Sequence, residues 1–182
     1  MMTQIIDGDS LFLHGDTLLA IGETKIDSTN RKKNIFAFHH VKLFKDDLQG
    51  SCDSLVYLAS DSTIRLYTDP VIWSGTNQLF ADSITLQTSN SEITFIYLTG
   101  NSFIASKADS VSVEILDSLR FNQIRGKTMV GVLSDNKLYR IDVTGNGQTI
   151  YYAKNKNDKN FEVKRADIKD LKKKIKKKKI KG

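Results

Sequence analysis

GSCDSLVYLASDSTIRLYTDPVIW, residues 50–73, is the stretch that decides the fold class. Its alternating runs predict two strands joined by a turn that contains aspartate. Because successive strand side chains point to opposite faces, Leu55 and Tyr57 would lie on one side and Val56 and Leu58 on the other. Both sides are apolar there, whereas a hairpin on the surface leaves one side polar. The stretch is therefore expected to lie between layers or to line an apolar space.

Alternating runs of this kind recur along the chain. They are NIFAFHHVKLF (34–44), NQLFADSITLQT (77–88), SEITFIYLTG (91–100), MVGVLSDNKLYRIDV (129–143) and QTIYYA (148–153). With one proline in 182 residues, Gly, Asn, Asp and Ser supply the turns between the runs. The pattern is typical of an all-β protein. VSVEI (111–115) is expected to add a short strand, and helical spacing occurs only at Ile168, Leu171 and Ile175.

Three stretches of the chain repeat one pattern. The first landmark of each unit is Asp53, Asp82 or Lys127, and the second is Pro70, Gly100 or Gly145, which follows 17, 18 and 18 residues later. Apolar residues stand two places after the first landmark (Leu55, Ile84, Met129) and four before the second (Leu66, Ile96, Ile141), whereas hydroxyl residues stand one place after the first (Ser54, Ser83, Thr128). This alternation predicts strands with one buried face. Because one strand pair cannot bury its own apolar face, the units are expected to stack.

The composition allows a core and divides the charge unevenly. Hydrophobic residues make up 40% of the chain, and the single Cys52 excludes an internal disulfide. No window reaches the roughly 18 uninterrupted apolar residues of a membrane-spanning helix. Residues 164–182 hold ten lysines and one arginine against two aspartates, so this tail carries +9 and residues 1–163 carry −3 of the net +6. The sequence therefore predicts a domain over residues 1–155 and, over 156–182, a Lys-rich tail or a degenerate further repeat.

Reactive groups do not form a recognisable catalytic pattern. RGKT (125–128) ends like a phosphate-binding loop, but Phe121 stands where such a loop needs glycine, and a strand is expected to follow. His39 and His40 are adjacent on a predicted strand, so they would point to opposite faces, half-buried, and could not share one metal ion. The recurring aspartates are expected to accept hydrogen bonds in turns and at strand ends; they are Asp53, Asp61, Asp69 and Asp82. We expect no enzyme activity, no cofactor and no metal site.

Aromatic residues occur on both parities of the predicted strands. They are Phe36, Phe38, Tyr57, Trp73, Phe95, Tyr97 and Phe103. An ordinary core explains any one of them, but the apolar content of 35–44 and 93–98 exceeds what a two-layer core uses. A groove that takes up a lipid would use this surplus, and a tight sandwich would use it as well.

Most of residues 5–155 resembles the OstA-like (LptA-like) domain family of lipopolysaccharide transport, and most closely its larger envelope proteins. The stretches that carry the resemblance are GDSLFLHGDTLLA (8–20), FAFHHVKLFKDDLQGSCDSLVYLASDSTIRLYTDPVIWS (36–74), FNQIRGKTM (121–129) and IDVTGNGQTIYYAKN (141–155). The resemblance implies an elongated, half-open β-jelly roll that shields lipopolysaccharide acyl chains in its groove. It also implies end-to-end strand pairing with other OstA-like domains and a periplasmic, outer-membrane-associated location.

The predicted lipid groove follows from combining this resemblance with the inward positions of the repeat. Its residues are Leu55, Leu66, Ile84, Ile96, Leu98, Met129, Ile141 and Val143. A structural β-stack with a dry core and no ligand is the competing interpretation, and a hydrolase or sugar-binding jelly roll is disfavoured because no site residues are evident.

Two further expectations concern the ends of the chain. The first residues, MMTQIIDGDS, lack the basic and apolar regions of an export signal, so the sequence fits either a cytosolic protein or one whose leader has been removed. The Lys-rich tail is expected to be solvated, with attraction to an anionic membrane surface or to lipid phosphates as its functional interpretation. Nucleic-acid binding through this tail would be unspecific, and the acidic body argues against it.

Overall fold

The protein is all-β. The computed structural model describes residues 2–6, 9–22, 33–46, 48–89, 92–108, 120–134, 137–154 and 161–174, and none of these residues is helical. The strands are β1 (Met2–Ile6), β2 (Asp9–His14), β3 (Thr17–Gly22), β4 (Lys33–Lys45), β5 (Leu48–Leu58), β6 (Thr63–Tyr67), β7 (Val71–Ser74), β8 (Asn77–Phe80), β9 (Ser83–Ser89), β10 (Glu92–Lys107), β11 (Phe121–Ser134), β12 (Lys137–Lys154) and β13 (Phe161–Lys174). All pairings between them are antiparallel.

The long strands, β4, β5 and β10–β13, each take part in two layers of sheet, which we call wall A and wall B. Wall A consists of β3, β6, β9 and residues 33–38, 54–58, 92–99, 128–134, 137–144 and 170–174 of the long strands. Wall B consists of β1, β2, β7, β8 and residues 41–45, 48–52, 102–107, 121–126, 147–154 and 161–168. Register shifts separate the two parts of β4, β10, β11 and β12. Six strands also close a hydrogen-bonded ring, β5–β6–β9–β10–β8–β7, because β5 and β10 take part in both walls.

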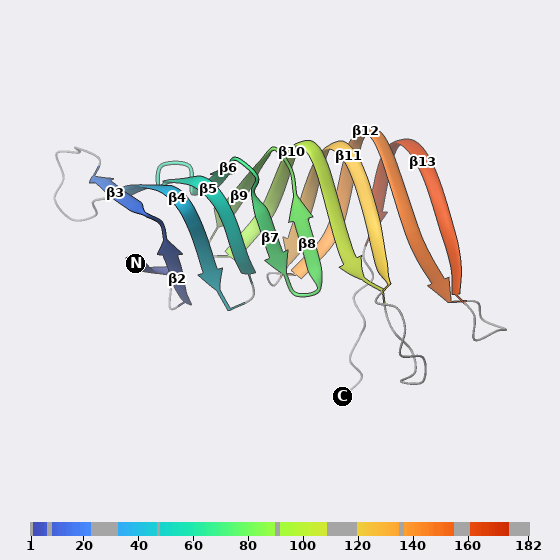
Figure 1. The fold of residues 1–182 in the computed structure, drawn as a ribbon, viewed down its shortest axis with the longest axis horizontal. Helices are drawn as coiled ribbons and strands as arrows, with labels where there is room; N and C mark the ends of the chain where they lie inside the picture. Colours follow the sequence, from blue (N-terminus) through green and yellow to red (C-terminus); the bar gives the residue numbers. More distant parts are fainter. Residues whose placement is uncertain are drawn as a thin grey trace.

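The walls meet along one edge, which we call the corner; it is the upper edge in Figure 1, over which the long strands arch. The backbone turns there through residues with positive φ, namely His39 and His40, Thr68 and Asp69, Gly100 and Asn101, and Gly145 and Asn146. An aspartate N–H on the neighbouring segment donates to the first residue of three of these pairs: Asp16 to His39 O (3.0 Å), Asp53 to Thr68 O (3.2 Å) and Asp82 to Gly100 O (3.0 Å). The repeat units therefore cross the corner through equivalent turns.

This geometry corrects one landmark of the repeat. The structural counterpart of Gly100 in the first unit is Thr68, because both carbonyls accept the equivalent aspartate N–H, and Pro70 stands two residues later. Leu66 is accordingly in register with Ile84, which pairs with Leu98 rather than with Ile96. The predicted parity is unaffected, since all four side chains are buried.

The core lies between the walls. In wall A the inward side chains form two registered rows, one through Leu55, Leu66 and Ile84 and the other through Ile64, Leu86 and Ile96. Ile72, Leu79 and Ile104 of wall B belong to the same buried cluster. One continuous apolar layer therefore joins the two walls.

Two expectations on the C-terminal part have different outcomes. The helical spacing of Ile168, Leu171 and Ile175 is wrong as a guide, because residues Phe161–Lys174 form β13, which pairs with β12. Pairing with β12 in the folded protein outweighs the local preference for a helix that such spacing indicates. The expected strand VSVEI (111–115) and the residues after 174 lie outside the described ranges.

Candidate functional site

The predicted groove residues all lie between the walls, and all are buried. The most exposed of them is Val143, at 2%. Register brings six of them into one row, Leu55–Leu66–Ile84–Leu98–Met129–Val143, while Ile96 and Ile141 stand in the neighbouring row on either side of Gly131. The repeat pattern thus identified one continuous apolar stripe. Side chains fill this space in the structure, since each of the eight is at most 2% exposed.

Contacts across the interior show how the walls close on each other. A Cβ placed on Gly50 of wall B would lie 3.6 Å from Leu66 Cδ2 of wall A. A Cβ on Gly126 of wall B would collide with Val143 Cγ1 of wall A. Opposing side chains therefore occupy the positions that these glycines leave free, and the middle of the interior is a packed core.

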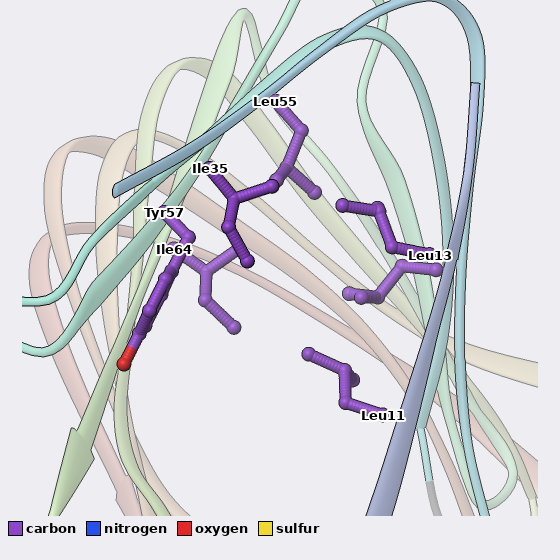
Figure 2. A pocket seen from close by; sticks show the side chains of 7 residues that line it. Leu11, Leu13, Ile35, Leu55, Tyr57 and Ile64 are labelled. Carbon is purple, nitrogen blue, oxygen red and sulfur yellow. The ribbon is translucent and has the colours of Figure 1, made fainter. Parts of the chain in front are cut away.

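A pocket remains at the N-terminal end of the interior (Figure 2). It is a small recess, with a cavity volume of about 20 Å³, and is lined by Leu11, Leu13, Ile35, Leu43, Leu55, Tyr57 and Ile64. Figure 2 shows Leu11 and Leu13 of β2 on one side and Ile35, Leu55, Tyr57 and Ile64 on the other. Of the predicted groove residues, only Leu55 lines this pocket.

The pocket is suited to an uncharged, apolar occupant. Tyr57 supplies the only polar side-chain atom among the seven lining residues. Burial raises the pKa of Tyr57 above its ordinary value, which shows that this environment disfavours charge. A carboxylate or phosphate group would therefore have to remain at the mouth, where water solvates it.

The sequence contained a signal for this pocket that the repeat pattern did not use. Leu11 and Leu13 share one parity in SLFLHG, and Ile35 shares the parity of the inward rows. Both stretches precede the first landmark, Asp53, so the three-unit alignment left them out. Extending the alignment back to Asp16, whose N–H bond matches those of Asp53 and Asp82, would have included Ile35, whereas Leu11 and Leu13 precede Asp16 and have only their own alternation as a signal.

The surplus of aromatic residues lies mainly on the outer faces of the walls. Phe38, Trp73, Phe95 and Tyr97 are 36–40% exposed, and Phe103 stacks on Phe80 with ring centroids 5.3 Å apart. Tyr57 alone of the predicted aromatic set lines the pocket. The expectation that a lipid groove would use this surplus is therefore wrong for the outward residues, because strand alternation turns them away from the interior.

Polar side chains gather at the corner. His40 Nδ1 lies 2.8 Å from Asp16 Oδ2, and His39 Nδ1 lies 3.3 Å from Asp53 Oδ1. Asn101 Nδ2 donates to both carboxylate oxygens of Asp82. The histidine side chains are 66% and 83% exposed, so the prediction that they are half-buried is wrong; the positive φ of both residues takes them out of the regular strand. The described residues contain no group of three or more ligands that could hold a metal ion.

Two further titratable groups are a buried cysteine, Cys52, and a turn aspartate, Asp61. Burial raises the pKa of the Cys52 thiol to about 12, so this cysteine is protonated at neutral pH and is a weak nucleophile. Asp61 accepts hydrogen bonds from the hydroxyl and the N–H of Thr63, as expected for a turn aspartate, and the hydroxyl bond lowers the pKa of Asp61. No helix among the described residues is long and apolar enough to cross a membrane.

No protein-family model matches the chain, and no curated protein matches it.

Proposed function

We propose that this chain is a non-catalytic lipid-binding module of the cell envelope, of the OstA-like class that its sequence resembles. In this proposal the two walls form an elongated β-jelly roll that shields acyl chains of lipopolysaccharide, or of another lipid, during transport to the outer membrane. The location would be the periplasm. The observation that carries the proposal is the apolar pocket between the walls, which adjoins the stripe of inward residues at Leu55.

The lining of the pocket supports an acyl chain rather than a polar ligand. Each CH₂ moved from water into such a site contributes about 0.8 kcal/mol before the cost of ordering the chain. Deeper insertion along Leu66, Ile84 and Leu98 requires these side chains to move, because they fill the interior. The pocket is thus the entry point, and the predicted groove is the path that a longer chain would open.

The ends of the sheet support the expected partners. In the described part of the chain β13 pairs with β12 alone, so its other edge is available to a strand of a neighbouring OstA-like domain. The tail charge of +9 over residues 164–182 favours an anionic membrane surface, at about 1 kcal/mol per Lys or Arg near that surface. No catalytic role is proposed.

A structural β-stack with a dry core is the second candidate. The near-complete burial of Ile84, Leu98 and Met129, each at most 1% exposed, favours it, because a stack needs no ligand to fill its interior.

Native mass spectrometry of the chain purified from a host with an outer membrane separates the two candidates. The lipid-binding module is expected to carry co-purified lipid and to bind a lipid A or fatty-acid probe saturably. A protein that shows no saturable binding to lipid A, phospholipid or fatty acid would contradict the lipid proposal and leave the dry stack.

A further inference from the structure

The turn between β2 and β3 is attached to β4 at the corner by polar contacts. The Asp16 N–H donates to His39 O at 3.0 Å, and the Asp16 carboxylate lies 2.8 Å from His40 Nδ1. Gly15 packs beside them, since a Cβ at this position would lie 3.5 Å from Ala37 Cβ and Val41 Cγ2. The turn therefore has one contact through the backbone and one through an ionisable pair.

This attachment lies next to the strand that forms one side of the pocket. β2 pairs with β4 only over Phe12–His14, in three registered pairs, and it carries Leu11 and Leu13 into the pocket lining. The Asp16 contacts lie immediately after this short pairing. On the other side of Asp16, β3 is held to β4 by six registered pairs, Thr17–Gly22. The weaker side of the turn is therefore β2, and loss of the contact at Asp16 would allow β2 to separate from β4 more often.

We infer that Asp16 and His40 form a proton-dependent clasp, which holds β2 over the apolar pocket when the imidazole is charged and loosens it when the imidazole is neutral. The charged groups that act on the pair are His14 on β2, His39 and Lys42 on β4, and Asp53 on β5. Asp53 favours the protonated form of His40, and Lys42 opposes it. The remaining contact of Asp16, from its N–H to His39 O, does not titrate.

The pH range of the clasp follows from the pKa shifts of its two members. The hydrogen bond to Asp16, followed by the charge of that carboxylate, raises the pKa of His40 above 6.5. The stability that comes from this shift is fully present below the pKa that His40 has in the unfolded chain. It is lost as the pH rises through the higher pKa that His40 has in the folded protein. The hydrogen bond from His40 lowers the pKa of Asp16 below 3.8, so this contribution is lost only as the pH falls through that lower value. The clasp is therefore strongest in mildly acidic solution.

Amide hydrogen exchange of the full chain tests the clasp directly. After correction for the intrinsic pH dependence, protection at Asp16 and at Phe12–His14 is expected to fall about two- to fivefold, the size typical of an exposed ion pair, as the pH rises from about 5.5 to about 8. His40→Asn keeps a residue that tolerates positive φ and should abolish this fall. His39→Asn, at the adjacent corner residue, is the matched control and should retain it.

Two results would overturn the inference. One is a wild-type protein whose protection at Asp16 changes with pH no more than it does at Leu98 in the middle of the fold. The other is an unchanged fall in His40→Asn. Exchange requires no ligand, so the clasp can fail while lipid binding is confirmed, and it can be confirmed while a saturable fatty-acid probe is not found.

Discussion

The N-terminal end of the apolar interior and its middle differ in packing, although the same inward rows run through both. In the middle, Ile84 and Met129 are at most 1% exposed, and a Cβ at Gly131 would lie 2.8 Å from Leu138 Cδ1. At the N-terminal end, Leu11 and Tyr57 are only partly buried and space remains between them. Strand alternation therefore determines which side chains face inward. Whether a cavity remains depends on how closely the opposing side chains approach.

The largest effect is expected from charge placed in the packed middle. Leu66→Asp and Ile96→Asp bury an unpaired carboxylate where the native side chains are 0% and 1% exposed. Each should lower the free energy of unfolding by several kcal/mol or prevent folding. Ser54→Asp and Ser83→Asp lie on the opposite parity and should change it by no more than about 1 kcal/mol. Chemical denaturation of the four variants checks this, and equal losses in both sets would show that the inward assignment is wrong.

The next largest effect is expected from larger side chains, which should destabilise the packed middle more than the N-terminal end. Ile84→Trp and Ile141→Phe overfill the packed middle and are expected to lower the free energy of unfolding by about 1–3 kcal/mol. Leu11 lines the pocket but is only partly buried, so Leu11→Trp can turn part of its ring toward solvent and should cost less than about 1 kcal/mol. Thermal melting provides the comparison. If Ile84→Trp melts like the parent while a lipid A probe binds less tightly, the middle is an open groove and not a packed core.

The turns by which the strands of the two regions cross the corner also differ in sequence, and glycine substitutions test this difference. The turns that follow the N-terminal end have glycine, at φ +74° (Gly100) and +76° (Gly145). Gly100→Ala should cost about 1–2 kcal/mol for the left-handed backbone, with a further loss because the new Cβ collides with the Asp82 carboxylate. Gly75→Ala is the matched control, since φ is +57° there and no atom lies within 4 Å of the new Cβ. Equal unfolding free energies for the two variants would show that the Asp82 contact adds nothing.

The reverse change, from a residue with a side chain to glycine, should have the smallest effect when it is made at His39, in the N-terminal turn of the corner. His39 has φ +60°, a conformation that costs a side-chain-bearing residue about 1 kcal/mol relative to glycine. His39→Gly is therefore expected to raise the free energy of unfolding by up to about 1 kcal/mol, less the greater freedom that glycine gives the unfolded chain. Denaturant titration measures the balance. A clear loss of stability would mean that the His39–Asp53 contact outweighs the backbone strain.

The sequence supported the all-β class and the inward parity because both depend on local alternation. Leu55, Leu66 and Ile84 were placed inward from spacing alone, and each is at most 1% exposed. Spacing could not place Thr68 as the counterpart of Gly100, because a positive φ at threonine has no compositional signature. It also could not separate packed from open interior, since Leu11 and Leu66 are both apolar inward residues and differ only in what lies opposite them.

Location of a bound acyl chain is the most direct test of a lipid site between the walls. A fatty acid that carries a photoreactive diazirine near the end of its chain should be cross-linked to the full-length protein and the labelled residues identified by mass spectrometry. A lipid site between the walls predicts saturable labelling, competed by unlabelled fatty acid, at the pocket residues around Leu13, Ile35 and Ile64. Labelling that is confined to the outer aromatic residues Phe95 and Tyr97, or that excess fatty acid does not displace, would contradict a lipid site between the walls.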